Sequence, residues 1–260
     1  LADFAAAETA YVQLNTLLPA SDPQRGQIVE RIASSIYKQG EQARTAGTYD
    51  VAVQHFLRVG QAAPASPVRA TAEYDAAAAL IQMGDWPRAT TVLENFRATF
   101  PAHELAPDVT AKLAVAYVEV GNGALAAGEF ERIAEGGGTP EVKREALWRS
   151  AELYAASGQG VQAAAVYGKF VQRYPRPVGE AVEATVLVGD ERGKVSQQVE
   201  SASDLDTDAI ITGSKCRVTR CRSGARVGGR VRGLRGERLG DQSILREVLV
   251  DEALIEHRER

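Results

Sequence analysis

Three aspartates that alternate with other residues form the pattern in this sequence closest to a metal-binding loop. Asp204, Asp206 and Asp208 would occupy the first, third and fifth places of a calcium loop. Such a loop needs a glycine at its sixth place for a sharp turn and a glutamate at its twelfth. Those places hold Ala209 and Lys215, so the sequence predicts no calcium site here.

Two other patterns also fall short of a working site. Residues 189–194 carry the glycines and lysine of a phosphate-binding loop, but the glycines stand one residue too close and Val195 replaces the serine or threonine. Cys216 and Cys221 are separated by four residues, with no partner cysteines or nearby histidines. Since a structural zinc site takes four such ligands, we expect neither a nucleotide nor a metal.

The histidines give no sign of catalysis. His55 lies beside Phe56 in an amphipathic segment, and His103 lies in a stretch typical of the first turn of a helix. No Ser/His/Asp or Cys/His set can be assembled. Paired acids such as Glu129 and Glu131 are typical of a solvated helix face. The sequence therefore predicts a protein that is not an enzyme and has no cofactor.

The dominant pattern is a repeat of 37 residues, which is marked by Gly47, Gly84, Gly121 and Gly158. Each glycine is followed, at fixed distances, by an alanine, two large apolar residues and a helix-stopping residue. A small residue precedes it by seven, and a second residue by four. These columns are Ala52, Ala89, Ala126 and Ala163; Phe56, Leu93, Phe130 and Tyr167; Val59, Phe96, Ile133 and Phe170; Pro64, Pro101, Gly138 and Pro175; and, upstream, Gly40, Ala77, Ala114 and Ala151, with Ala43, Leu80, Tyr117 and Tyr154.

These spacings have a mechanical meaning. Apolar residues at intervals of three, four and seven lie on one face of a helix. A glycine between two such segments ends the first helix in a left-handed conformation, and a proline stops the second. Each unit is therefore a helix hairpin, and neighbouring hairpins must stack to bury their apolar faces. The expected helices span 25–46, 49–61, 66–83, 86–99, 106–120, 123–135, 140–157 and 160–173.

The pattern resembles the tetratricopeptide repeat, whose signature is small–x2–aromatic, then alanine–x3–aromatic, then proline. The best copy runs from Ala146 to Gly158 and continues with Ala163, Tyr167 and Pro175, and the resemblance covers about residues 28–180. It implies an all-α, right-handed superhelix of stacked hairpins. The third unit departs most, because Gly123 replaces an aromatic residue and glycines at 136–138 replace the proline stop.

The aromatic residues point to a subgroup of these repeats. An aromatic residue stands ten before three of the turn glycines, and the pairs Phe100-Pro101 and Tyr174-Pro175 close two units. In this the chain resembles bacterial envelope proteins, such as outer-membrane assembly lipoproteins and the Tol–Pal-associated periplasmic coordinator. The resemblance implies a periplasmic or outer-membrane-associated protein rather than a cytoplasmic one.

Composition changes abruptly near residue 184. Residues 1–184 hold 39 alanines and all 16 aromatic residues, whereas residues 185–260 hold four alanines and no aromatic residue. A helix begins near Val178 and loses its apolar register after Ala184. Two interpretations account for the tail at 185–260: a stretch read out of frame, or a basic, disordered arm. The lack of aromatic residues between the arginines from Lys215 to Arg238 argues against nucleic acid as a partner.

The whole chain has 260 residues, a formal net charge of −4 and 45% apolar residues, which suits one or two domains with a real core. No apolar run approaches the roughly 20 residues of a membrane span. We divide the chain into an N-terminal helix or degenerate repeat at 1–24, four repeats at 25–184 and the tail at 185–260. Because it starts at Leu1 and its only methionine is Met83, we interpret it as a fragment or a processed form.

Such an array offers a binding surface, because the first helices of tetratricopeptide units line a concave groove. The residues at groove positions are aromatic at the ends, apolar in the middle and acidic toward the fourth unit. Aromatic anchors bury a large area with little loss of rotamer freedom, and the acids would favour a basic or amine-bearing peptide. The alternative is that the aromatic residues pack between units and the charges are solvated. The predicted groove residues are Tyr37, Glu41, Arg44, Tyr74, Asp108, Glu145, Trp148 and Glu152.

Our first hypothesis is therefore a non-enzymatic scaffold that binds a peptide or a partner protein in this groove. The alternative is a nucleic-acid-binding adaptor that uses the run from Lys215 to Arg238. We also expect self-association through the exposed end of the last repeat, since a repeat array needs a polar terminal cap.

Overall fold

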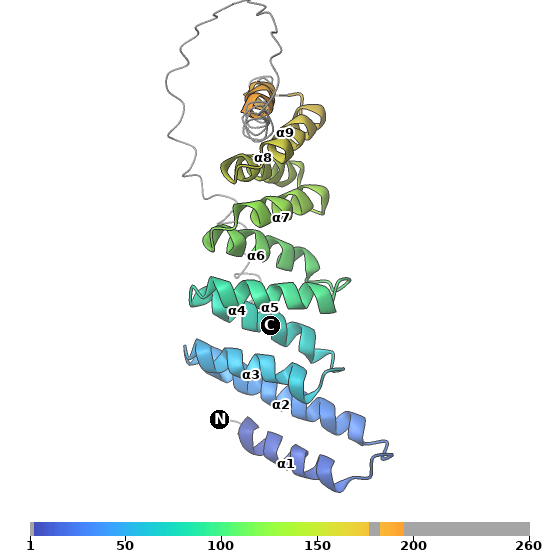
Figure 1. Ribbon diagram of the computed structural model, residues 1–260. Helices are drawn as coiled ribbons and strands as arrows, with labels where there is room; N and C mark the ends of the chain where they lie inside the picture. The colour runs from blue at the N-terminus through green and yellow to red at the C-terminus, as the bar shows by residue number, and fades with distance from the viewer. Residues whose placement is uncertain (1–2, 177–182, 195–260) are drawn as a thin grey trace, which may run out of the picture. The chain divides into compact units, whose positions relative to one another are not determined.

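The computed structural model describes residues 3–176 and 183–194, and these belong to two compact units, Leu1–Gln159 and Gly160–Arg260 (Figure 1). All regular structure in the described ranges is helical, as the sequence predicts. In the first unit each helix packs against the next one along the chain. The helices are α1 (Phe4–Leu17), α2 (Arg25–Thr45), α3 (Tyr49–Ala62), α4 (Val68–Gln82), α5 (Trp86–Thr99), α6 (Ala106–Glu119), α7 (Gly123–Glu135), α8 (Pro140–Ala156) and, in the second unit, α9 (Gly160–Arg173).

The eight helices expected from the 37-residue register are all present, and their ends agree with the predicted ends to within two residues. The four turn glycines explain this agreement. Their φ angles are 75°, 70°, 77° and 74°, in the left-handed region that other residues resist. After each glycine the chain reverses with a bond back to the helix, as from Asp85 N to Leu80 O at 2.9 Å. This is the Schellman motif, in which backbone N–H groups after the helix donate hydrogen bonds to carbonyl groups of its last turn.

The repeated apolar columns form the core. The alanine column is fully buried, with Ala52, Ala89, Ala126 and Ala163 at 0% exposure. The large residues four positions later, such as Phe56 and Leu93, are also buried. The small residues seven before each glycine are buried too, as expected for points where two helices approach closely.

The alanine column gives a direct test of the packing. We expect the substitution Ala89→Leu to lower the free energy of unfolding by about 1–3 kcal/mol, because a larger side chain must displace a fully packed neighbour. Ala98→Leu, at an exposed position of the same helix, is the control and should change stability little. Urea unfolding of both variants measures the difference, and equal midpoints would show that α5 is packed differently.

The third unit departs from the pattern for reasons that the packing supplies. A Cβ atom on Gly123 would lie 2.5 Å from Ser157 Oγ at the end of α8, so glycine replaces the aromatic residue there. The stop that proline provides elsewhere comes from three glycines, of which Gly138 has a φ of 105°. Thr139 then caps α8, its hydroxyl accepting from Val142 N at 3.3 Å, and Pro140 occupies the first turn.

The predicted tail begins within a helix. Residues 183–194 are helical and most of them are exposed, so the first part of the segment 185–260 is helical, and loose packing of the tail stays a prediction. Lys194 pairs with Asp190 at 3.0 Å and with Glu191 at 2.6 Å, which supports the last turns from within the helix. The rest of the predicted tail, including the run from Lys215 to Arg238, lies outside the described residues.

Candidate functional site

All eight predicted groove residues lie on α2, α4, α6 and α8, the first helices of their hairpins, within the first unit. We call the side chains that these helices present at the predicted groove positions and next to them the first-helix face. The stacking of hairpins repeats these positions every 37 residues. The predicted residues comprise two groups, the separate residues Tyr74 and Glu41, and two exposed acids.

The first group joins α2 to α4. Tyr37 Oη donates a hydrogen bond to Asp75 Oδ2 at 2.6 Å, and Arg44 Nη1 lies 3.6 Å from Asp75 Oδ1. The Tyr37 ring also packs at 5.4 Å from the ring of Phe56, between centroids. Asp75 is only 7% exposed. We call Tyr37, Arg44 and Asp75 the Tyr37–Asp75 cluster, and it fixes two predicted groove residues against the next hairpin.

Burial governs the protonation of this cluster. Desolvation raises the pKa of Asp75, although the hydrogen bond from Tyr37 and the charge of Arg44 oppose the shift. Desolvation and the neighbouring Asp75 also raise the pKa of Tyr37, so its hydroxyl stays protonated and remains a donor. The carboxyl of Asp75 is therefore the group in the cluster whose charge depends on pH.

The raised pKa of Asp75 predicts a pH dependence of stability. An unfolded aspartate has a pKa of about 3.9, so the stability that protonated Asp75 contributes is fully present below that pH. It is lost as the pH rises through the higher folded pKa. Relative to Asp75→Asn, which keeps an acceptor for Tyr37, the wild-type free energy of unfolding should fall as pH rises from about 4 to neutrality. Urea unfolding of both proteins over this range measures it, and a constant difference would contradict the shift.

The predicted aromatic residue Tyr74 is more a core residue than a groove residue. It is 9% exposed, and Lys112 Nζ of α6 lies 5.5 Å from the centroid of its ring. Lys112 itself is 8% exposed. Such a cation over an aromatic face is attracted by the ring electrons, more strongly where water is excluded. Tyr74 therefore links α4 to α6, as Tyr37 links α2 to α4.

The second group lies on α8. Trp148 Nε1 donates to Glu152 Oε1 at 3.0 Å, and Arg149 Nη1 donates to Glu152 Oε2 at 3.2 Å. Trp148 is half-buried, and the structure thus brings together two residues that the sequence analysis had placed in the groove. The charge of Glu152 is balanced by Arg149, so the acidic end of the predicted face is less acidic than the sequence suggested.

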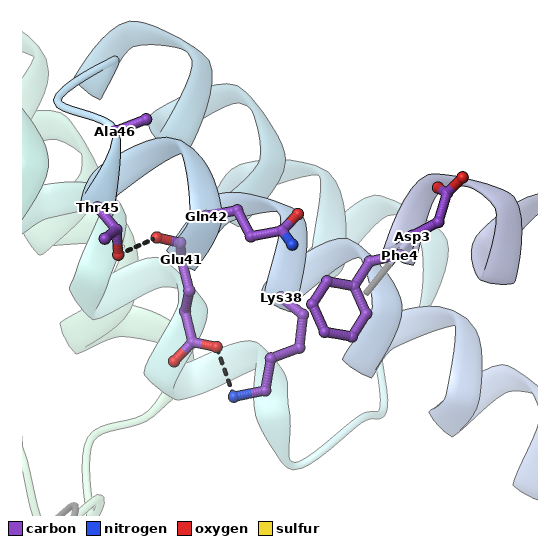
Figure 2. A pocket seen from close by; sticks show the side chains of 7 residues that line it. All are labelled: Asp3, Phe4, Lys38, Glu41, Gln42, Thr45 and Ala46. Carbon is purple, nitrogen blue, oxygen red and sulfur yellow. Dashed lines mark hydrogen bonds and ion pairs between the residues drawn. The ribbon is translucent and has the colours of Figure 1, made fainter. Parts of the chain in front are cut away.

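Glu41 lies near the Tyr37–Asp75 cluster, where its charge raises the pKa of both Tyr37 and Asp75, and it lines an open pocket between α1 and α2 (Figure 2). Lys38 Nζ pairs with Glu41 Oε2 at 2.6 Å, and Thr45 Oγ1 donates to the backbone oxygen of Glu41 at 2.8 Å. In this view the ring of Phe4 lies on the other side of the Lys38 side chain, and the Gln42 side chain lies above it. The pocket has a volume of about 910 Å³.

The two remaining predicted residues are exposed acids. Asp108 lies in the first turn of α6, where a negative charge interacts favourably with the helix dipole. Glu145 lies in the middle of α8, one turn before Trp148. Both are exposed, so both are accessible to a partner.

The sequence analysis did not single out the charged residues that directly follow the position ten residues before each turn glycine. The column nine residues before the turn glycine holds Lys38, Asp75, Lys112 and Arg149. Asp75 directly precedes four alanines, and Lys112 is next to Leu113. Both segments have the apolar composition of a buried helix. A charged residue at a repeated, buried position was the available signal, because such a residue must find a partner.

Polar contacts also join the second helix of one hairpin to the next hairpin, and the tyrosine–glutamate contact repeats after 37 residues. Tyr117 Oη donates to Glu94 and Tyr154 Oη donates to Glu131, the latter at 3.3 Å. Desolvation and Glu94 raise the pKa of Tyr117 to about 12. Arg97 Nη1 lies 2.6 Å from the buried Glu129 Oε1. These ties hold neighbouring hairpins in register, and they have a structural role.

In the part of the chain that the structure describes, no group of three or more histidines, cysteines or acids is placed to hold a metal ion. Over the same residues, no helix combines the length and the apolar character needed to cross a membrane.

The solved structures to which this chain is similar have low sequence identity to it. MamA residues 41-end from Desulfovibrio magneticus RS-1 is 16% identical, covers 66% of this chain and 97% of its own, and has a TM-score of 0.39. The thermophilic TPR protein TTC0263 from Thermus thermophilus is 18% identical, with coverages of 71% and 90% and a TM-score of 0.31. BtubC (BKLC) from P. vanneervenii is 12% identical, with coverages of 88% and 100% and a TM-score of 0.34.

Among curated proteins, none matches this sequence significantly. The family profile YfiO, described as outer membrane lipoprotein, matches residues 30–178. That range contains α3 to α9 entire, most of α2 and all four turn glycines. Because the match spans more than half of the 260 residues, the chain belongs to the YfiO outer membrane lipoprotein family.

Proposed function

We propose that this protein is a non-enzymatic scaffold that holds a peptide segment of a partner protein on its first-helix face. The observation that carries the proposal is that an accessible aromatic residue on α8 and exposed acids on α6 and α8 all belong to the first-helix face. Trp148 is half-buried, and Asp108 and Glu145 are exposed. An aromatic anchor supplies apolar area, and carboxylates beside it select for a basic or amine-bearing segment.

The other predicted residues support the same face in a different way. Tyr37 and Arg44 are held by Asp75, and Tyr74 is covered by Lys112. A surface whose side chains are already fixed loses little conformational entropy when a ligand binds. The proposed scaffold thus has a rigid portion on α2 and α4 and an accessible, acidic portion on α6 and α8.

The family description supports an envelope location, and we propose that the protein works at the outer membrane or in the periplasm. The alternative function, nucleic-acid binding by the run from Lys215 to Arg238, depends on residues outside the described ranges. A titration with RNA at several salt concentrations tests it, because phosphate contacts give a steep salt dependence.

The test of the scaffold uses two labelled peptides that share one apolar sequence and differ only in carrying lysines or glutamates. We expect the lysine peptide to bind more tightly. The double variant Asp108→Arg/Glu145→Arg should weaken its binding by about 5-fold or more, since each exposed charge pair contributes up to about 1 kcal/mol.

The control is Asp50→Arg/Glu135→Arg, which makes the same charge change at exposed positions of the second helices α3 and α7. It should leave the affinity for the lysine peptide nearly unchanged. Equal affinities for the two peptides, or equal losses in the two double variants, would contradict the proposed acidic peptide site.

A further inference from the structure

One short motif occurs twice among the four first helices: an aromatic residue, a basic residue, two others and a glutamate. Both copies stand at the same offsets from their turn glycines, whereas α4 and α6 have Ala78 and Val115 in place of the glutamate. In both copies the basic side chain pairs with the glutamate three residues later, at 2.6 Å in α2 and at 3.2 Å in α8. The copies are Tyr37-Lys38-x2-Glu41 in α2 and Trp148-Arg149-x2-Glu152 in α8.

The aromatic residues of the two copies use their polar groups differently. Tyr37 Oη donates to Asp75 of α4, so this hydroxyl is bound to the next hairpin. Trp148 Nε1 donates to Oε1 of Glu152 in its own motif, and Arg149 Nη1 donates to the other oxygen, Oε2. Of the two copies, only the one on α8 thus joins an aromatic ring, a cation and a carboxylate in one group. We call Trp148, Arg149 and Glu152 the Trp148–Glu152 cluster.

This cluster adjoins the proposed peptide site. Glu145, Trp148 and Glu152 are spaced by three and four residues, so they lie along one stripe of α8. The side chains of Arg149 and Glu152 are 29% and 37% exposed, so a ligand on that stripe can reach them. A partly exposed pair on one helix contributes at most about 1 kcal/mol, and a stronger partner for Glu152 can therefore replace Arg149.

We propose that Arg149 determines the specificity of this site, because it occupies Glu152 in the free protein and is displaced by an arginine, but not by a lysine, of the partner segment. This role rests on the proposed function, since the ligand is the segment held on the first-helix face. The partner is thereby narrowed from a basic segment to one that carries an arginine.

The difference between the two cations gives the physical reason. An arginine donates two parallel hydrogen bonds to a carboxylate, and its planar group packs on the exposed part of an indole ring. A lysine offers a single point charge, so its exchange for Arg149 at Glu152 brings no gain. A lysine segment remains bound through Asp108 and Glu145, without using Glu152.

The test adds an arginine peptide to the lysine peptide of the scaffold experiment, with the same apolar sequence and the full chain as receptor. Fluorescence anisotropy should show that the wild-type protein binds the arginine peptide about 3-fold more tightly or better. Arg149→Gln should raise the affinity for the lysine peptide by about 3-fold or more, since Glu152 is then open to an ammonium group. The gain for the arginine peptide should be smaller, so the preference narrows.

Three control variants separate this role from a change in charge or in packing. Lys38→Gln removes the same charge at the equivalent place in α2, and it should change either affinity by less than about 2-fold. Arg149→Lys keeps a cation for Glu152, as Lys38 does for Glu41, and should retain the wild-type affinity for the lysine peptide. Glu152→Gln keeps an acceptor for Trp148 Nε1 and should abolish the preference for arginine.

The outcomes distinguish this role from the scaffold itself. If the wild-type protein binds both peptides equally, or if Arg149→Gln raises the affinity for the lysine peptide no more than Lys38→Gln does, Arg149 does not determine specificity, although the scaffold stands. If neither peptide binds, both the scaffold and the role of Arg149 are wrong. A higher affinity of Arg149→Gln cannot come from a loss of structure, because unfolding would weaken binding.

Discussion

Replacing Phe56 with alanine should lower the free energy of unfolding by about 3–5 kcal/mol. Its ring is fully buried between the two helices of the first hairpin, against Tyr37 and the backbone at Gly40. Removing it leaves a cavity that helices held by their neighbours on both sides cannot collapse to fill. Urea unfolding followed by circular dichroism measures the loss.

Tyr11→Ala is the matched control, because Tyr11 lies eight residues after the N-cap Asp3 of α1, as Phe56 lies eight residues after the N-cap Thr48 of α3. Tyr11 is only half-buried, so the expected loss is smaller, about 1–2 kcal/mol. If Tyr11→Ala destabilised the protein as much as Phe56→Ala, full burial of the ring would not be the reason for the large effect at Phe56.

Replacing Gly40 with alanine should lower the free energy of unfolding by about 3 kcal/mol, the upper end for overpacking. An alanine normally stabilises a helix interior relative to glycine by about 1 kcal/mol. Here its Cβ would lie 2.5 Å from a Phe56 ring carbon, and that buried ring has no room to move. The cost of the steric overlap therefore exceeds the gain in helix propensity, so the substitution lowers the free energy of unfolding.

Gly26→Ala on the same helix is the control. Gly26 is exposed, and nothing lies within 4 Å of a Cβ added there, so the substitution should be neutral or stabilising by up to about 1 kcal/mol. Combining Gly40→Ala with Phe56→Leu should recover part of the loss, since leucine leaves space where the ring was. Additive effects of these two substitutions would show that the contact between α2 and α3 is not the cause.

The fold was predictable because its signals are local and repeated. A left-handed glycine, a small residue at a helix crossing and a proline stop each act within a few residues, and four copies at one spacing reinforce one another. The helix ends near Gly84 and Gly158 therefore agreed with expectation. The helix at 183–194 was not anticipated in full, because the apolar register ends at Ala184 while ion pairs of Lys194 support the following turns.

The candidate site was less predictable, because its residues take their roles from partners on other helices. Tyr37 and Tyr74 occupy one column, and the sequence assigned both to the groove. In the structure Tyr37 bonds to Asp75, and Tyr74 is buried beneath Lys112. Glu152 was predicted to be an exposed acid, and its partner is local: Arg149, three residues before it on the same helix, lies 3.2 Å away. The position of a residue in the 37-residue repeat predicts the helix face on which it lies, but it does not predict which residue it contacts.

The sequence by itself determined the repeat, the helices and the buried columns, since these follow from periodicity and from the backbone preferences of glycine and proline. The tertiary structure alone decided which polar groups meet across the hairpins and which aromatic residues are covered. These depend on contacts between side chains 23 to 38 residues apart, such as Tyr117 with Glu94 and Tyr37 with Asp75. Such contacts exist only after the hairpins stack, because stacking removes water from one side of each helix and sets the partner that each polar group finds there.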